Sequence, residues 1–137
     1  MGNTKVDRID YDNDTATSSP KGNLNTARSF PGSTGNSSYG YWGGGTGPLS
    51  SVDRVDYNND TATASPKGNL LTEASQGGGA GNLTHGYCIG GHMNYNIRSY
   101  VYRVDYANDT ATSSPRGNTA LAGNYVDSVG NSDFAFS

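Results

Sequence analysis

Apolar and polar residues alternate over short stretches of the chain and do not follow a helical stripe. The segment VDRVDY, which begins at Val52, places Val55 and Tyr57 on one face of an extended chain. Val52, Arg54 and Asp56 lie on the other face. No segment carries apolar residues at the 3.6-residue spacing of an amphipathic helix. We therefore expect an all-β protein with short strands and almost no helix.

Turn-forming residues separate the predicted strands. The residues 58–60, Asn-Asn-Asp, predict a turn because such side chains hydrogen-bond to their own backbone. A second strand is predicted over 61–65, where Pro66 ends it, and a weaker third strand over 70–75. The fourth strand is predicted over 85–89. Each unit of the chain thus holds four short strands.

These strands belong to a segment that occurs three times. The copy at Val6 reads VDRIDYDNDTATSSPKGNL, the copy at Val52 reads VDRVDYNNDTATASPKGNL, and the copy at Val101 reads VYRVDYANDTATSSPRGNT. The copies start 46 and 49 residues apart, and a glycine-rich aromatic segment begins 29 residues after each start, as at Gly35. The extra residues of the longer period lie after Gly91, in HMNYNIRSY, which we interpret as a loop insertion.

The order of these segments resembles the kelch repeat. An aromatic-Gly-Gly segment (39–45, YGYWGGG) is followed by a variable loop, a strand, an N-D-T turn and a proline (52–70). The tryptophan that kelch repeats carry after the turn is replaced by Ser18, Ala64 and Ser113. The repeat sequences are also similar to the kelch-like repeats in predicted structural or tail proteins of marine cyanophage virions. The resemblance implies β-propeller blades of four strands each.

We expect one domain, 1–137, whose repeats span approximately 6–51, 52–100 and 101–137. In this register the blades are circularly permuted, with a half-blade at each end of the sequence. Three blades are too few for a closed propeller. We therefore expect a homo-oligomer completed through its half-blades, as a six-bladed dimer or a filament. The alternative is a fragment of a longer repeat protein.

Composition excludes several classes of protein. Charged residues make up 15% of the chain and hydrophobic residues 32%, and the chain has 20 glycines and 10 tyrosines. This composition fits strands and turns better than charged disorder. The net charge of −3 and the lack of a basic stripe argue against nucleic acid as a partner. Cys88 is the single cysteine, so no internal disulfide is expected. No apolar run is long enough for membrane insertion or for a signal peptide.

One charged pattern recurs in all three copies and predicts a structural ladder. An arginine and an aspartate stand two residues apart on one strand face, which suits ion pairs between adjacent blades. The residues of this predicted ion-pair ladder are Arg8, Asp10, Arg54, Asp56, Arg103 and Asp105.

Metal, calcium and glycosylation sites are not predicted from the remaining motifs. The segment 10–14, DYDND, lacks the glycine and glutamate of an EF-hand loop. His85 and Cys88 fall on opposite faces of one strand, and with His92 they offer no fourth ligand. No cofactor is expected. The sequons at Asn13, Asn36, Asn59, Asn82 and Asn108 are interpreted as incidental, since three of them form the repeated turn.

Aromatic residues supply the candidate ligand-binding site. Tyr95 and Tyr100 lie in or beside the insertion, and Tyr41 and Trp42 belong to the aromatic-glycine segment. Their rings suit stacking on sugars, so surface glycans are a candidate ligand. The alternative for Tyr41 and Trp42 is that they fill the blade interface.

The sequence holds little that could be catalytic, since Glu73 is the single glutamate and no nucleophile motif is present. We expect a non-enzymatic structural or attachment protein of virion type, a phage tail or fibre component that contacts other virion proteins, located in a virion or outside the cell. A lectin-like or scaffold module of cellular or extracellular origin is the alternative, and a kelch-scaffold enzyme the second alternative.

Overall fold

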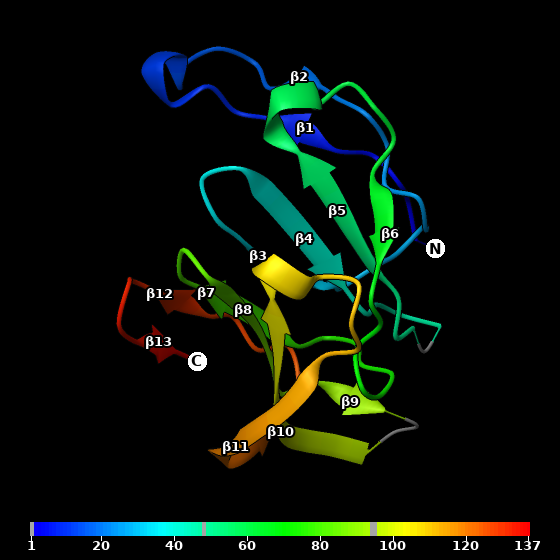
Figure 1. Ribbon diagram of the computed structural model, residues 1–137, viewed down its shortest axis with the longest axis vertical. Coiled ribbons are helices and arrows are strands. Elements are labelled where there is room, and N and C mark those ends of the chain that lie inside the picture. Colours follow the sequence, from blue (N-terminus) through cyan, green and yellow to red (C-terminus); the bar gives the residue numbers. More distant parts are fainter. Residues whose placement is uncertain (1, 48, 94–95) are drawn as a thin grey trace.

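The structure, a computed structural model, describes residues 2–47, 49–93 and 96–137 and is all-β (Figure 1). Within these residues the only helical segments are three short 3₁₀ turns, which confirms the expected near absence of helix. The strands form several antiparallel sheets, and none of the sheets closes on itself. No helix in the described residues is long and apolar enough to cross a membrane.

Two larger sheets make up the centre of the molecule. The first has the order β3-β4-β5-β6, formed by Gly32–Gly35, Tyr39–Gly43, Val52–Asp56 and Ser65–Lys67. The second has the order β7-β8-β10-β11, formed by Gly78–Gly81, His85–Ile89, Asn96–Asp105 and Ser114–Gly123. Strand β9 (His92–Met93) pairs antiparallel with the start of β10, so the insertion predicted as a loop after Gly91 contributes paired strands. Each sheet takes two strands from one sequence repeat and two from the next, as the permuted register predicts.

Two small sheets reproduce the halves of a larger one. Strands β1 (Asp7–Arg8) and β2 (Ser19–Pro20) pair Arg8 with Ser19, as β5 and β6 pair Arg54 with Ser65. Strands β12 (Val129–Gly130) and β13 (Ala135–Phe136) pair Gly130 with Ala135. The pair of β3 and β4 that corresponds to it joins Gly35 to Gly40. Sheet β1-β2 therefore has the register of the outer half of the first large sheet, β5-β6. Sheet β12-β13 has the register of its inner half, β3-β4.

Each copy of the repeat forms the same turn after its first strand. The three 3₁₀ turns are η1 (Tyr11–Asn13), η2 (Tyr57–Asn59) and η3 (Tyr106–Asn108). They confirm the predicted Asn-Asn-Asp turn. A second common feature is a non-glycine residue with positive φ before the next unit: φ is 55° at Phe30, 59° at Gln76 and 54° at Tyr125. The three copies thus share backbone geometry as well as sequence.

Two strand predictions are wrong. Residues 61–62 continue the turn, residues 63–64 belong to no strand, and β6 begins at Ser65 and contains Pro66. Proline is accommodated because β6 is the edge of its sheet, where a missing N–H breaks no ladder bond. The segment 70–75 is not a strand, and only Ser75 forms an isolated bridge, with His92.

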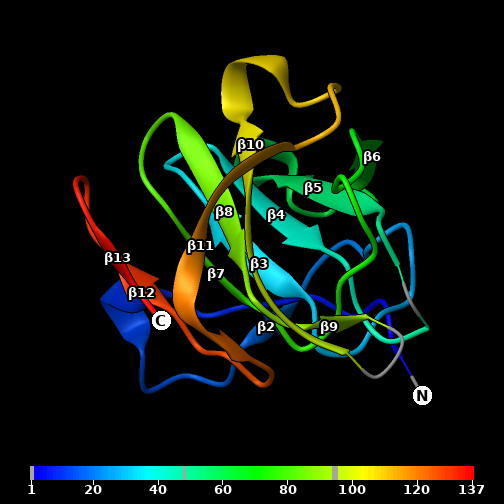
Figure 2. The same ribbon diagram turned by 90° about the horizontal axis from the view of Figure 1, so that it is seen from below.

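The glycine-rich inner strands β3 and β7 were not predicted. They lie beside each other where the two larger sheets meet, as both ribbon views show (Figures 1 and 2). A Cβ atom on Gly79 would stand 1.9 Å from the carbonyl oxygen of Ser33. Glycine, a poor strand former in isolation, is needed here because the two backbones approach so closely.

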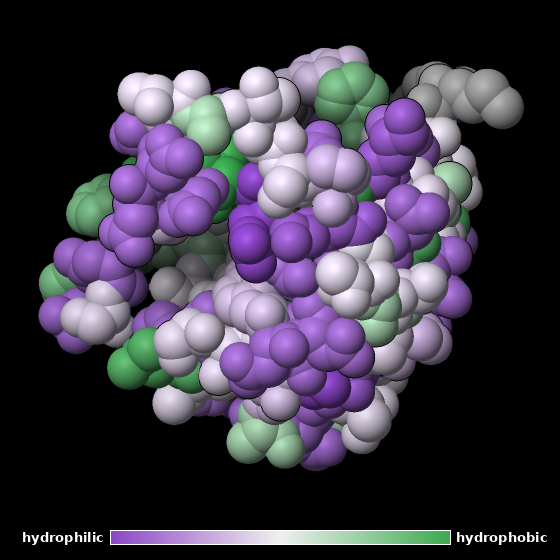
Figure 3. Space-filling view, turned by 90° about the horizontal axis from the view of Figure 1, so that it is seen from above, coloured by the Kyte–Doolittle hydropathy of each residue, from purple (hydrophilic) through white to green (hydrophobic). Residues whose placement is uncertain are grey.

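The hydrophobic core lies between successive units and repeats with them. One cluster joins Tyr41 and Val52 of the first large sheet to Leu70 and Cys88. One repeat earlier, Leu24, Val6 and Trp42 stand at the positions of Leu70, Val52 and Cys88, and they belong to a second cluster with Val55 and Ala64. The outer surface seen from above is mostly hydrophilic, with scattered hydrophobic residues and a hollow towards its left side (Figure 3).

Candidate functional site

Charged side chains link each unit to the turn of the next one. The Arg54 guanidinium lies 2.7 Å from Oδ2 of Asp109, and the Lys67 ammonium lies 3.4 Å from its Oδ1. The hydroxyl of Tyr41 donates to Oδ2 of Asp109 over 2.9 Å. Burial, together with the Asp109 carboxylate, raises the pKa of Tyr41 far above its usual value, so the hydroxyl remains a donor.

The same arrangement occurs one repeat earlier with fewer donors. Arg8 lies 2.6 Å from Oδ2 of Asp60, and Lys21 lies 3.5 Å from its Oδ1. We call these two sets the inter-repeat ladder: Arg8, Lys21 and Asp60, then Arg54, Lys67 and Asp109. In each set the cations come from one copy of the repeat and the carboxylate from the next.

The ladder corrects the predicted pairing. Asp10, Asp56 and Asp105 are not the ion-pair partners of the arginines in the described residues. Each accepts a hydrogen bond from the backbone N–H two residues later, at 2.9–3.1 Å, and so caps its 3₁₀ turn. An aspartate followed by a turn is drawn to the free backbone N–H groups, which leaves the arginine for the carboxylate of the next repeat.

Backbone contacts accompany each set of the ladder. The N–H of Gly22 donates to the carbonyl of Asp60, and that of Gly68 donates to the carbonyl of Asp109, both over 2.8 Å. A Cβ on Gly22 or Gly68 would stand 1.9 Å from the carbonyl oxygen of Ala62 or Ala111, respectively. The glycine of the Pro-Lys-Gly (PKG) motif, residues 20–22 and 66–68, is therefore needed because a side chain there would collide with the turn of the next repeat.

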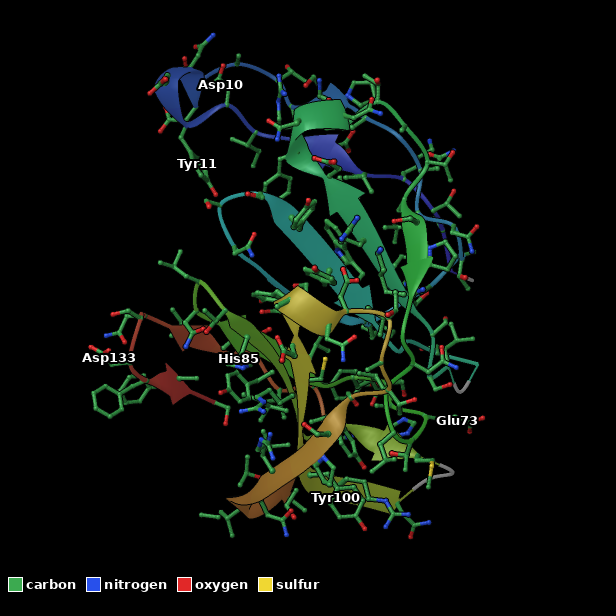
Figure 4. The ribbon with its side chains drawn as sticks, in the orientation of Figure 1. Asp10, Tyr11, Glu73, His85, Tyr100 and Asp133 are labelled. Carbon is green, nitrogen blue, oxygen red and sulfur yellow. The ribbon has the colours of Figure 1, made fainter. Side chains whose placement is uncertain are left out.

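A tyrosine from each turn packs between units. The Tyr106 ring stacks on Tyr41 with centroids 4.8 Å apart, and its hydroxyl lies 2.8 Å from Oγ1 of Thr34. Burial raises the pKa of Tyr106 to about 12. The corresponding Tyr57 is 47% exposed and Tyr11 is 92% exposed. Tyr11 extends away from the η1 turn in Figure 4.

The third copy of the repeat has the cations of the ladder without a carboxylate. Within the described residues, Arg103 has no side-chain hydrogen bond or ion pair, and its Nε is buried. Arg116, which corresponds to Lys67, donates to the carbonyl of Pro115 over 3.2 Å and has no ion pair in the part of the chain that the structure describes. A Cβ on Gly117 would meet nothing within 4 Å. The first copy has a carboxylate without cations, since Asp14 is exposed and forms no ion pair with any residue that the structure describes.

Two hollows lie next to the small sheets. One of about 310 Å³ is lined by Tyr87, Gly81 and Ala135, among others, between the second large sheet and β12-β13. The other, of about 560 Å³, lies beside β1 and is lined by Tyr11 and Tyr57, among others.

The aromatic residues of the predicted site lie in different surroundings. Tyr41 is 1% exposed and serves the ladder. Trp42 packs against the second core cluster and also lines the hollow of about 560 Å³ beside β1. Tyr100 is partly exposed and lies edge-on to Tyr102. Tyr95 lies outside the described residues.

The potential metal ligands do not converge. Among the described residues no group of three His, Cys, Asp or Glu side chains could hold a metal ion. Cys88 is buried, and burial raises its pKa to about 11, whereas His85 bonds through Nδ1 to the hydroxyl of Thr84 at 2.8 Å. His85, Glu73 and Tyr100 lie in separate parts of Figure 4.

A buried ion pair, which the sequence did not indicate, fixes the N-terminal segment to the first large sheet. Nη2 of Arg28 lies 2.9 Å from Oδ2 of Asp53, and both side chains are buried. Arg28 also donates to the carbonyls of Gly44 and Ser51. In the next unit Tyr102 replaces Asp53 and bonds to Thr72. The signal in the sequence is that neither partner is kept in the next repeat, where Ala74 stands at the position of Arg28 and Tyr102 at that of Asp53.

A scan against protein-family models and a search of curated proteins found no match for this chain.

Proposed function

We propose that the protein is a non-enzymatic structural or attachment protein whose kelch-like blades join copies of the chain edge to edge. The observation that carries this proposal is the pair of small sheets. Sheet β1-β2 has the register of the outer half of a four-stranded sheet, and β12-β13 has that of the inner half. Each is complementary to the other.

Both small sheets leave an apolar edge uncovered. Ile9 is 59% exposed, whereas Val55, at the same position in the next repeat, is 3% exposed within its complete sheet. Phe134 and Phe136 are also exposed. Unpaired edges of this kind invite strand addition.

The register of the complete sheet defines how the edges would join. In the first large sheet, Gly40 of β4 pairs with Val55 of β5. Placed in the same register, Ala135 of one copy pairs with Ile9 of another. The result is a further four-stranded sheet that covers the exposed apolar residues of both copies.

We propose that the copies assemble in a virion or in another extracellular structure. This part of the proposal is supported by the resemblance of the repeats to kelch-like repeats of virion proteins. Two copies contribute six blades to a closed ring, and unclosed contacts give a filament.

Light scattering with size-exclusion chromatography tests the proposal on the full chain. We expect a mass of at least two chains, each of 14.3 kDa. Ile9→Lys places a charge at the joining edge and should shift the chain to a folded monomer. Leu83→Lys, a change at an exposed apolar residue in the turn between β7 and β8, is the matched control and should leave the mass unchanged. A folded wild-type monomer at all concentrations would overturn the proposal.

A further inference from the structure

The unpaired ends of the ladder are complementary in charge and in shape. The second large sheet presents Arg103, Arg116 and Tyr87 at the positions that Arg54, Lys67 and Tyr41 occupy in the first. In the first sheet those three side chains hold Asp109. The third set of the ladder is thus built in full except for its carboxylate.

The missing carboxylate exists elsewhere on the same chain. Asp14 has the position of Asp109 in its repeat, on an exposed turn. Tyr11 corresponds to Tyr106, and Ala16 to Ala111. The η1 turn therefore carries every group that η3 uses to dock in the chain.

We infer that the η1 turn of one copy docks on the second large sheet of another copy, with Asp14 on Arg103 and Arg116 and with Tyr11 stacked on Tyr87. This inference rests on the proposed function, because it specifies the contact that accompanies strand joining. The partner is a second copy of this chain, bound head to tail.

The hollow beside Tyr87 lies where Tyr11 would enter. In the chain, the hydroxyl of Tyr106 lies so close to Gly81 and Gly86 that a Cβ on either would stand 2.7 Å from it. The counterparts for Tyr11 are Gly130 and Ala135, and Ala135 and Tyr87 both line the hollow of about 310 Å³. Because Ala135 has a Cβ, Tyr11 lies slightly further out than Tyr106.

The open space beside Gly117 is further evidence for the same contact. Gly22 and Gly68 admit the backbone of a neighbouring turn, whereas the space beside Gly117 is open in the single chain. In the docked pair the carbonyl of Ala16 fills that space. A methyl group on Gly117 thus leaves the single chain unchanged and obstructs the pair.

The contact joins two different surfaces, so charge reversal on one surface can be rescued by mixing. Asp14→Lys copies lose the docking turn and keep the docking sheet, while Arg103→Glu copies keep the turn and lose the sheet. Each variant alone should self-associate at least about 100-fold more weakly, the effect expected of a truncated charge pair at an interface. An equimolar mixture should associate again, because wild-type Asp14 meets wild-type Arg103.

Sedimentation velocity of the full chains measures these affinities. Asp12→Lys, on the same turn outside the ladder, and Lys5→Glu are the matched charge controls and should associate as the wild type does. Gly117→Ala should fold with wild-type circular dichroism and remain monomeric, which keeps the test valid if a charge variant is poorly folded.

Each outcome separates the inference from the proposed function. Wild-type association in Asp14→Lys, Arg103→Glu and Gly117→Ala would overturn the docking contact, while loss of association in Ile9→Lys alone would leave the proposed function standing. Failure of the mixture to associate, when the controls do, would also overturn the contact. A wild-type monomer would overturn both.

Discussion

Cys88 shows how burial of one residue makes the fold sensitive to alkaline pH. Its side chain lies in the core cluster with Tyr41, Val52 and Leu70, between the two large sheets. Burial raises the pKa of the thiol from 9.0 to about 11, because the thiolate would lose its hydration there. The thiol therefore remains protonated in the folded chain at pH values at which the unfolded chain releases the proton.

We expect this thiol to reduce the stability of the fold as the pH rises from about 9 to 11. Below pH 8 both states hold the proton and the contribution is fully present. Above pH 9 the unfolded chain is stabilised by releasing this proton, and the loss of folding free energy reaches about 2 kcal/mol near pH 11. Urea unfolding of the wild type and of Cys88→Ala across this range measures it. The variant, although less stable at pH 7, should lose less stability with pH, and parallel curves would contradict the assignment.

At the scale of single elements, the PKG glycine allows one turn to pack against the neighbouring unit. Gly68 stands where a Cβ would collide with the carbonyl of Ala111, while Gly117 faces open space. Neither glycine has a positive φ, so a substitution tests the space beside it and not the backbone conformation.

We expect Gly68→Ala to destabilise the chain by about 2–3 kcal/mol, since the collision is with backbone and forces β6 and η3 apart. Gly117→Ala should change the stability of the single chain by less than about 1 kcal/mol, with a small gain from reduced unfolded-state entropy. Chemical denaturation at a concentration below association compares the two. Equal effects would mean that the turn does not pack as closely as the geometry requires.

The sequence predicted those elements whose cause is local. The valine-aspartate strand and the Asn-Asn-Asp turn both follow from residues within one repeat, although the capping of that turn by Asp56 was not predicted. Strands β3 and β7 did not, because Gly78 and Gly79 resemble a turn until the neighbouring backbone is known. The ladder was assigned to the wrong aspartates for the same reason: Asp60 and Asp109 reach arginine only across units, and no spacing within one repeat indicates that contact.

At the scale of the whole molecule, the units contact their neighbours in sequence, and the two central sheets have neighbours on both sides. The outer sheets β1-β2 and β12-β13 are short and have no buried residues within their strands. Local stability should therefore fall from the centre towards both ends of the molecule.

Hydrogen exchange should reveal this gradient and its dependence on association. In dilute solution we expect strong protection in β4, β5, β8 and β10 and rapid exchange in β1 and β13. At concentrations at which copies associate, β1 and β13 should become protected, because their free N–H groups pair between chains. Exchange followed by mass spectrometry at two concentrations measures the change. Unchanged exchange in β1 and β13 on association would show that copies meet through another surface.

Phe136 occupies the position of Tyr41 in its unit and lacks the hydroxyl that Tyr41 donates to the ladder carboxylate. Where β13 of one copy completes the sheet beside Asp60 of another, that carboxylate therefore keeps two donors, whereas Asp109 has three. In the proposed contact at Asp14, by contrast, the carboxylate would meet three donors, Arg103, Arg116 and the hydroxyl of Tyr87. If copies join as proposed, each joint would therefore hold one carboxylate by three donors and the neighbouring one by two, so that the η2 turn at Asp60 would be the first part of the joint to loosen.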